Sequence, residues 1–204
     1  MNIIVFGASG GTGREVVKLA LEEGHRVTAF VRTPSKLTIQ HPLLQRVEGN
    51  GLDRERVIEA IKGHDAVISA LGTDGLKKTT ALSEITSHIL AGMKEHDVSR
   101  IAYTASAGID NEIPGFTGFM ATKILKNVLA DHKRAVDLLK ESGTEWTIAR
   151  PLRLEDGTRT GGYRMEASGV PQGGKSISRS DVAHFLLNSV TKQDYIFRSV
   201  GLAY

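Results

Sequence analysis

The feature that most constrains this chain is a run of glycines between a predicted strand and a predicted helix. Asn2–Phe6 is a short, mostly apolar segment, typical of a buried strand. Gly13–Glu23 carries apolar residues at helical spacing, and this pattern stops at Gly24. The two segments are joined by Gly7-Ala8-Ser9-Gly10-Gly11-Thr12-Gly13. A strand, a glycine-rich turn and a helix in this order predict the opening of a βαβ unit.

Three of these glycines have separate physical reasons to be glycine. Gly7 lets the chain turn tightly off the strand, Gly10 lets a pyrophosphate approach the backbone, and Gly13 lets the helix pack closely on the sheet. The N–H groups at the start of the helix would then face the phosphates. The pattern predicts a dinucleotide-binding loop, with an ordinary glycine-rich turn as the alternative. The loop residues assigned to the cofactor are Gly7, Ser9, Gly10, Gly11, Thr12 and Gly13.

Strand and helix patterns alternate along the rest of the chain. Alternation with continuous apolar strands favours a parallel sheet that is covered on both faces. The predicted fold class is therefore α/β, a doubly wound Rossmann fold with a mainly parallel sheet and helices on both faces. Ser180 is the expected N-cap of the last helix, with Asp181 in its first turn. Further strands are predicted at His25–Val31, Leu44–Glu48, Asp65–Leu71, Arg100–Thr104 and Glu145–Ala149.

Composition bounds the domain organisation. The chain has 204 residues, of which 40% are hydrophobic and 24% charged, values that suit one soluble globular domain. We expect a single NAD(P)-binding domain over residues 1–204. Residues 151–178 contain many Gly, Arg and Thr and have no helical period, and they predict a small, loop-rich cap over the substrate.

Composition also disfavours several function classes. A net charge of +3 without a basic cluster argues against a nucleic-acid partner. The chain has no cysteine and its seven histidines are dispersed, so no metal site is predicted. No apolar run approaches the roughly 20 residues that cross a bilayer, and no secretory signal is seen, so we expect a cytoplasmic location without a membrane partner. No pattern indicates an oligomeric state.

The end of the second predicted strand distinguishes the two nicotinamide dinucleotides. An acidic residue there would bind the ribose 2′-hydroxyl of NAD and repel a 2′-phosphate. The chain instead continues Arg32-Thr33-Pro34-Ser35-Lys36. Arg32 offers a planar fork to a phosphate, and Ser35 or Lys36 can assist. We therefore predict NADP(H) in preference to NAD(H); the alternative is that Arg32 is a solvated surface residue.

Other cofactor positions follow from their place after predicted strands. Asn50 and Gly51 follow the third strand, where Asn50 can hydrogen-bond the adenine, although a plain turn is the alternative. The segment 71–73 follows the fourth strand, where the backbone would lie along the nicotinamide ribose. The positions assigned in this way are Asn50, Gly51, Leu71, Gly72, Thr73 and Pro151.

The glycine spacing resembles that of the short-chain dehydrogenase/reductase superfamily, in its extended and atypical branches. Typical members use a serine with Tyr-x-x-x-Lys, in which the tyrosine donates the proton. The frame here is Phe119-Met120-Ala121-Thr122-Lys123, and Phe119 has no hydroxyl. Alcohol dehydrogenation by the usual pair is therefore disfavoured, and Lys123 is expected to be a surface helix residue. His132 is expected to be packed or surface-facing rather than catalytic.

Ser106 is the predicted catalytic residue. It follows the fifth strand, at the sheet edge where ligands bind in open α/β folds. The alternative is a serine that only caps its loop.

Over essentially all of its length the chain resembles atypical reductases of the NmrA-like group, and within it the family of biliverdin-IXβ and NADPH-dependent flavin reductases. The resemblance implies that the glycine loop and Arg32 hold NADP, and that Ser106 lies beside the nicotinamide and the acceptor. The family has an active-site histidine just after the sixth strand, where this chain has Leu152, followed by Arg153. Ser106, Leu152 and Arg153 are thus the expected substrate contacts. The stretches that carry the resemblance are 7–13, 27–32, 65–73, 104–106, 131–133, 139–143 and 177–185.

These features together predict an NAD(P)H-dependent reductase that transfers hydride to a flavin or a similar planar small molecule. Flavin would be a substrate and not a prosthetic group, and the protein would mainly align the two rings. The alternative from another class is a non-catalytic, NADP(H)-binding redox sensor of NmrA type. A quinone or an enone is a third possible acceptor class.

Overall fold

The structure, a computed structural model, describes residues 1–73, 75–110, 112–113, 115, 120 and 123–204. Phe119, Ala121 and Thr122 of the Tyr-x-x-x-Lys frame lie outside the described residues, and Lys123 is exposed. The helices are α1 (Gly11–Glu22), η1 (Pro34–Lys36), α2 (Arg54–Ile61), α3 (Ala81–Glu95), α5 (Lys126–Glu141) and α6 (Arg179–Thr191). The strands are β1 (Asn2–Phe6), β2 (Arg26–Val31), β3 (Leu44–Glu48), β4 (Ala66–Ser69), β5 (Arg100–Thr104), β6 (Glu145–Pro151), β7 (Arg153–Glu155), β8 (Arg164–Glu166), β9 (Ser176–Ser178) and β10 (Arg198–Ala203).

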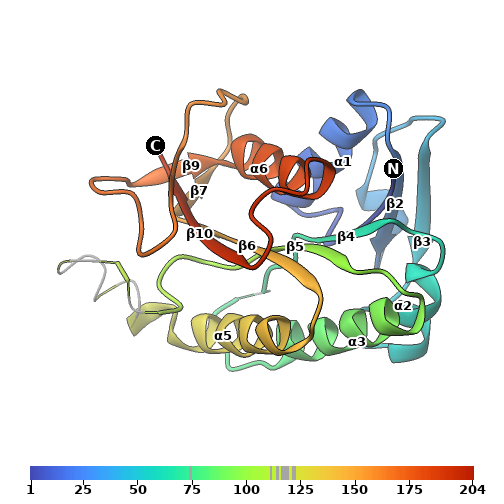
Figure 1. The fold of residues 1–204 in the computed structure, drawn as a ribbon, viewed down its shortest axis with the longest axis horizontal. Coiled ribbons are helices and arrows are strands. Elements are labelled where there is room, and N and C mark those ends of the chain that lie inside the picture. The colour runs from blue at the N-terminus through green and yellow to red at the C-terminus, as the bar shows by residue number, and fades with distance from the viewer. Residues whose placement is uncertain (74, 111, 114, 116–119, 121–122) are drawn as a thin grey trace.

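Eight strands form one twisted sheet in the order β3-β2-β1-β4-β5-β6-β10-β8 (Figure 1). All neighbouring strands pair in parallel except β8, which is antiparallel to β10. The predicted α/β class and the mainly parallel sheet are therefore confirmed. The strand β10 was not predicted, and neither were the three short strands within residues 151–178, of which β7 and β9 form a separate parallel pair.

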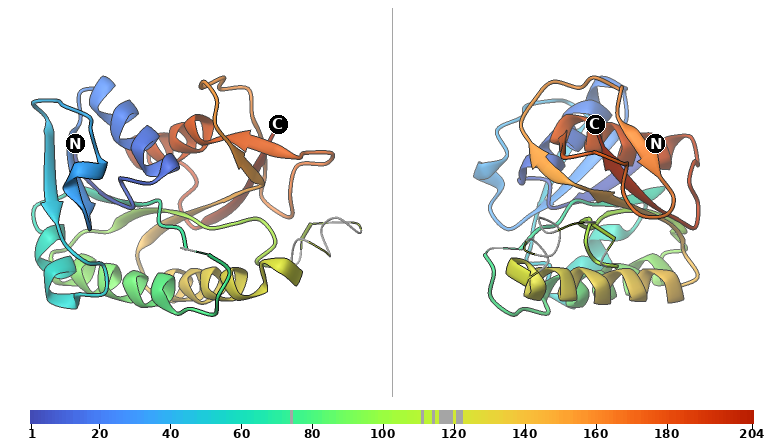
Figure 2. Two further views of the ribbon diagram at one scale, coloured as in Figure 1. Left: turned by 180° about the vertical axis from the view of Figure 1, so that it is seen from behind. Right: turned by 90° about the vertical axis from the view of Figure 1, so that its left-hand side faces the viewer.

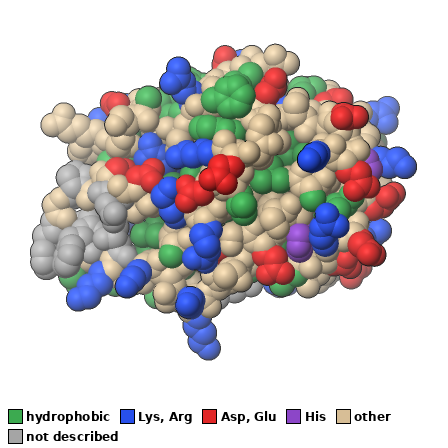
Figure 3. All heavy atoms as spheres, turned by 60° about the horizontal axis from the view of Figure 1, so that its bottom comes forward, with side chains coloured by type: hydrophobic (Ala, Val, Ile, Leu, Met, Phe, Trp, Pro, Cys, Tyr) green, Lys and Arg blue, Asp and Glu red, His purple; other side chains and the backbone are tan. Residues whose placement is uncertain are grey.

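Helices cover both faces of the sheet (Figures 1 and 2). Alternate residues of β1 enter different cores: Ile3 and Val5 pack with α1 and α6, whereas Ile4 and Phe6 pack with α2, α3 and α5. Burial on both faces explains why this strand is apolar without alternation. On the side of the molecule that carries α3 and α5, positive and negative side chains are interspersed (Figure 3).

The last helix begins earlier than the sequence predicted. Ser180 is not its N-cap; Ser178 is, and its Oγ accepts a hydrogen bond from the Asp181 amide at 3.0 Å. Ser178 ends β9 with an extended backbone, so its side chain reaches the first-turn amide that a cap must satisfy. Ser180 lies inside the helix and donates to Glu15 instead. Asp181 is in the first turn, as predicted.

Candidate functional site

The carboxyl ends of the parallel strands lie along one edge of the sheet, and the strand order reverses between β1 and β4. From β1 the chain enters α1 on one face, whereas from β4, the neighbour of β1, it enters α3 on the other. Ligands of open α/β sheets bind at such a switch point. The topology brings to this edge all the predicted site segments: residues 7–13, Arg32, 50–51, 71–73, Ser106 and 151–153.

The glycine loop holds β1, β4 and α1 close together. Gly7 has a φ of +77°, and a Cβ there would lie 2.5 Å from the Ala70 carbonyl oxygen at the end of β4. A Cβ on Gly13 would clash with the carbonyl oxygen of Gly7. The Gly10 amide closes the turn by donating to Gly7 O at 2.9 Å. Glycine is therefore required at both ends of the loop for backbone packing.

The first turn of α1 fits an anionic ligand. Its N-cap is Gly10, with an extended backbone, and among the described residues no side chain caps it. The first turn also contains no acidic residue, and Gly11 is exposed. Amides at a helix N-terminus need acceptors and carry the positive end of the helix dipole. The residues present thus fit the diphosphate of a dinucleotide.

A cationic turn lies beside this loop. Arg32 directly follows β2 and is exposed, and Lys36 ends the short helix η1. Arg14 on α1 donates from Nη2 to the carbonyl oxygens of Ser9 and Lys36, both at 3.2 Å, and so ties the turn to the glycine loop. The sequence from residue 24 to residue 47 has no acidic residue. Arg14 escaped the sequence analysis because its contact with Lys36 spans 22 residues.

The predicted acceptor residues lie on adjoining segments. Beyond the end of β5 the backbone stays paired with β6, because the Ala107 amide donates to the carbonyl oxygen of Pro151, the last residue of β6, at 3.0 Å. This bond places Ser106, which is partly exposed, beside Pro151 and Leu152. Ser106 Oγ donates to Ala107 O at 3.0 Å. The Arg153 side chain is 80% exposed and pairs with Glu155 at 3.5 Å, an exchangeable surface contact.

A buried ion pair joins Glu112, six residues after Ser106, to β6. Arg150 Nη1 donates to Glu112 Oε1 at 2.5 Å, and the two side chains are 4% and 8% exposed. Arg150 Nε also donates to Ser199 Oγ on β10, while Glu112 Oε2 accepts from the Asp110 amide. Glu112 therefore links the backbone of Asp110 to β6. The signal in the sequence was Arg150, a charged residue directly after the apolar pair Ile148-Ala149.

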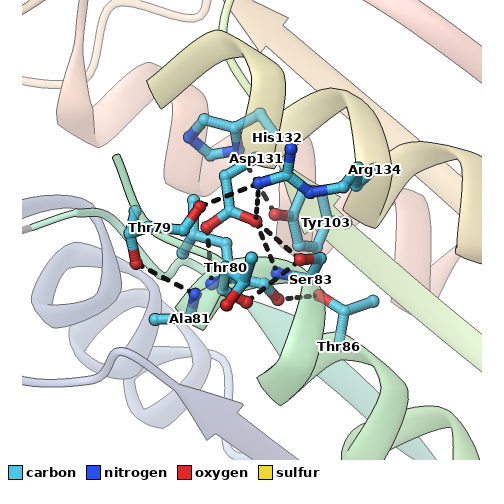
Figure 4. A network of polar contacts seen from close by, with 10 residues as sticks. Thr79, Thr80, Ala81, Ser83, Thr86, Tyr103, Asp131, His132 and Arg134 are labelled. Atoms are coloured by element: carbon cyan, nitrogen blue, oxygen red, sulfur yellow. Dashed lines mark hydrogen bonds and ion pairs between the residues drawn. The ribbon is translucent and has the colours of Figure 1, made fainter. Parts of the chain in front are cut away.

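A second buried network lies under the sheet (Figure 4). The Tyr103 hydroxyl and His132 Nδ1 are 3.2 Å apart, and both side chains are buried. Burial lowers the pKa of His132 to about 4 and raises the pKa of Tyr103. His132 is thus packed and neutral near pH 7, within the range that the sequence analysis expected. Its neighbour Asp131 accepts hydrogen bonds from the amides of Leu82 and Ser83.

Within the described ranges, no helix is both long enough and apolar enough to cross a membrane. Nor do three or more His, Cys, Asp or Glu side chains come together there in a way that could hold a metal ion.

Known proteins resemble this chain over nearly its whole length. YwnB of Bacillus subtilis is 28% identical over 212 residues, which cover 96% of this chain and 94% of YwnB. Reductase pytE of Aspergillus terreus is 24% identical over 259 residues, with coverage of 99% and 97%. The fold matches ChuY, an anaerobillin reductase from Escherichia coli O157:H7, with a TM-score of 0.79, 21% identity, and coverage of 98% and 97%.

A family model described as NAD(P)H-binding matches residues 7–193, a range that begins at the first glycine of the loop and includes every predicted site segment. The chain belongs to this NAD(P)H-binding family of Rossmann-fold proteins.

Proposed function

We propose that this protein is an NADPH-dependent reductase that passes hydride to a flat, diffusible acceptor such as FMN or riboflavin. Family membership and the reductase relatives support the broader class of NAD(P)H-dependent oxidoreductases. The observation that carries the proposal is the first turn of α1, which no described side chain caps and which lies next to a cationic turn at the switch point of the sheet.

Each part of the site has a role in this proposal. The first-turn amides of α1 bind the diphosphate, and Arg32 with Lys36 binds the 2′-phosphate. When bound, the nicotinamide supplies the hydride. The Ser106 hydroxyl orients the nicotinamide amide or the acceptor, and residues 151–153 flank the acceptor. The acceptor gains one hydride, and solvent supplies the accompanying proton.

The tyrosines favour an acceptor that needs no side-chain acid. Tyr103 is fully buried beneath the sheet, and Tyr195 precedes β10 at the amino edge. Tyr204 donates a hydrogen bond to Asp181. The Tyr163 hydroxyl hydrogen-bonds to His184 on α6. Burial raises the pKa of the Tyr163 hydroxyl to about 12. A flavin suits this site better than a simple carbonyl does, because flavin reduction depends mainly on ring alignment.

The cofactor assignment predicts that Arg32→Ala weakens NADPH binding selectively. Charge-assisted hydrogen bonds contribute about 1.5–3 kcal/mol, so the Kd for NADPH should rise about ten- to a hundredfold. The Kd for NADH, which lacks the 2′-phosphate, should change less than about twofold. Titration of nicotinamide fluorescence measures both values.

Arg26→Ala is the matched control for this experiment, because Arg26 is an exposed arginine at the opposite end of the same strand. It should leave both dissociation constants unchanged. An equal loss of NADPH and NADH affinity in Arg32→Ala would show that Arg32 does not recognise the 2′-phosphate.

A further inference from the structure

Arg179, the first residue of α6, lies across the start of α1. A Cβ on Gly11 would be 2.6 Å from both Cδ and Nε of Arg179, so the arginine side chain rests directly on the Gly11 backbone. Helices α1 and α6 pack side by side on the same face of the sheet (Figure 1). A residue 168 positions away in the sequence thus reaches the helix N-terminus that fits a diphosphate.

The scaffold fixes the backbone that carries Arg179. The Oγ of its neighbour Ser180 lies 3.0 Å from Glu15 Oε2 on α1 and 2.8 Å from Gly157 O, and its single hydrogen is shared between these two acceptors. The carboxylate of Asp181, which is fully buried, accepts hydrogen bonds from the backbone amides of Thr160 and Gly161. The start of α6 is therefore bound both to α1 and to the segment 157–161.

The guanidinium group of Arg179 is paired with a carboxylate that another anion can replace. Its Nη1 donates to Asp156 Oδ1 at 2.7 Å, and the Asp156 side chain is 94% exposed. An ion pair with so exposed a carboxylate contributes little to stability, because water solvates the carboxylate equally well. The diphosphate of a dinucleotide at the start of α1 would offer the same guanidinium two negative charges, against one on Asp156, and oxygens that can pair with it in the bidentate way.

We propose that Arg179 is a further binding residue for the cofactor diphosphate, and that it exchanges Asp156 for a phosphate oxygen when the dinucleotide binds. The proposal rests on the dinucleotide site proposed above. The glycine loop would hold the diphosphate through its backbone, and Arg179 would supply the countercharge from α6. The absence of a side chain at Gly11 leaves the space that this arginine occupies.

The test is a fluorescence titration of Arg179→Ala with NADPH and, separately, with NADH. Both dinucleotides contain the diphosphate, so both dissociation constants should rise by the same factor, about ten- to a hundredfold. Arg179→Lys keeps the charge without the fork and should lose less than Arg179→Ala does. Asp156→Asn removes the competing carboxylate and should bind both dinucleotides about threefold more tightly. Arg198→Ala, at the amino edge of the sheet, is the matched control and should change nothing.

The outcomes separate this inference from the proposed function. Unchanged affinity in Arg179→Ala, or a loss confined to NADPH, would overturn the diphosphate assignment. If Arg179→Ala does not fold, equal affinities of the wild type, Arg179→Lys and Asp156→Asn would overturn it as well. A wild-type protein that binds neither dinucleotide would instead overturn the proposed function, whatever the variants do.

Discussion

Replacing Gly13 with alanine should force α1 away from β1 and abolish dinucleotide binding. The added Cβ would clash with the Gly7 carbonyl oxygen and would lie 2.7 Å from the Gly7 carbonyl carbon and 3.0 Å from Ala8 Cα. These are backbone atoms of the loop itself, so no side-chain rotation can relieve the clash. We expect the free energy of unfolding to fall by about 3 kcal/mol or more.

Urea unfolding followed by circular dichroism measures the stability of Gly13→Ala, and fluorescence titration measures its affinity for NADPH. Gly162→Ala is the control, because the nearest heavy atom to its added Cβ is 3.9 Å away. The control should unfold within about 0.5 kcal/mol of the wild type. Wild-type stability and affinity in Gly13→Ala would contradict the close packing of the glycine loop.

Replacing Asp131 with alanine should cost about 3–5 kcal/mol of stability. The N-cap of α3 is Thr80, whose side chain makes no capping bond. Asp131 on α5 replaces that cap: it accepts the Leu82 amide at 3.0 Å, the Ser83 amide at 3.2 Å and Ser83 Oγ at 2.6 Å (Figure 4). Alanine would leave the Leu82 and Ser83 amides without their acceptor and would remove one of the partners of Arg134, which also donates to Thr79 O.

Asp137→Ala is the matched control on the same helix. Its carboxylate is about half exposed and pairs with Lys133 one turn away, an interaction that contributes about 0.3–0.5 kcal/mol. The comparison is the free energy of unfolding in urea. If both aspartate variants unfold at the same urea concentration, the carboxylate of Asp131 does not hold α3 against α5.

Local patterns were enough to predict the part of the fold that forms the site. The order of strand, glycine loop and helix is encoded within the first 31 residues, and the apolar strands follow because both faces of the sheet are covered. The position of the last helix was wrong by two residues because Ser178 and Ser180 are both capping residue types, and only the end of β9 selects the first. The strand β10 contains Gly201, which lies against the Gly169 carbonyl oxygen. The apolar pattern of β10 is therefore interrupted by a glycine, and the reason is a close backbone contact that exists only in the folded chain.

The side chains that the sequence analysis missed act across long separations. Asp131 belongs to a stretch on which the family resemblance rests, yet its role depends on amides 48 and 49 residues away. Glu112 lies 38 residues from Arg150, and Arg179 meets Gly11 from the far end of the chain. No periodicity or spacing encodes such contacts, because they arise when the helices dock on the sheet.

The most direct test of the proposed reductase is the rate of NADPH oxidation with excess FMN, followed by nicotinamide absorbance, with NADH and an enzyme-free mixture run in parallel. We predict a saturable, enzyme-dependent rate that is higher with NADPH than with NADH. Tight NADPH binding without any rate above the enzyme-free mixture would contradict flavin reduction and would favour a sensor or a reductase of another acceptor.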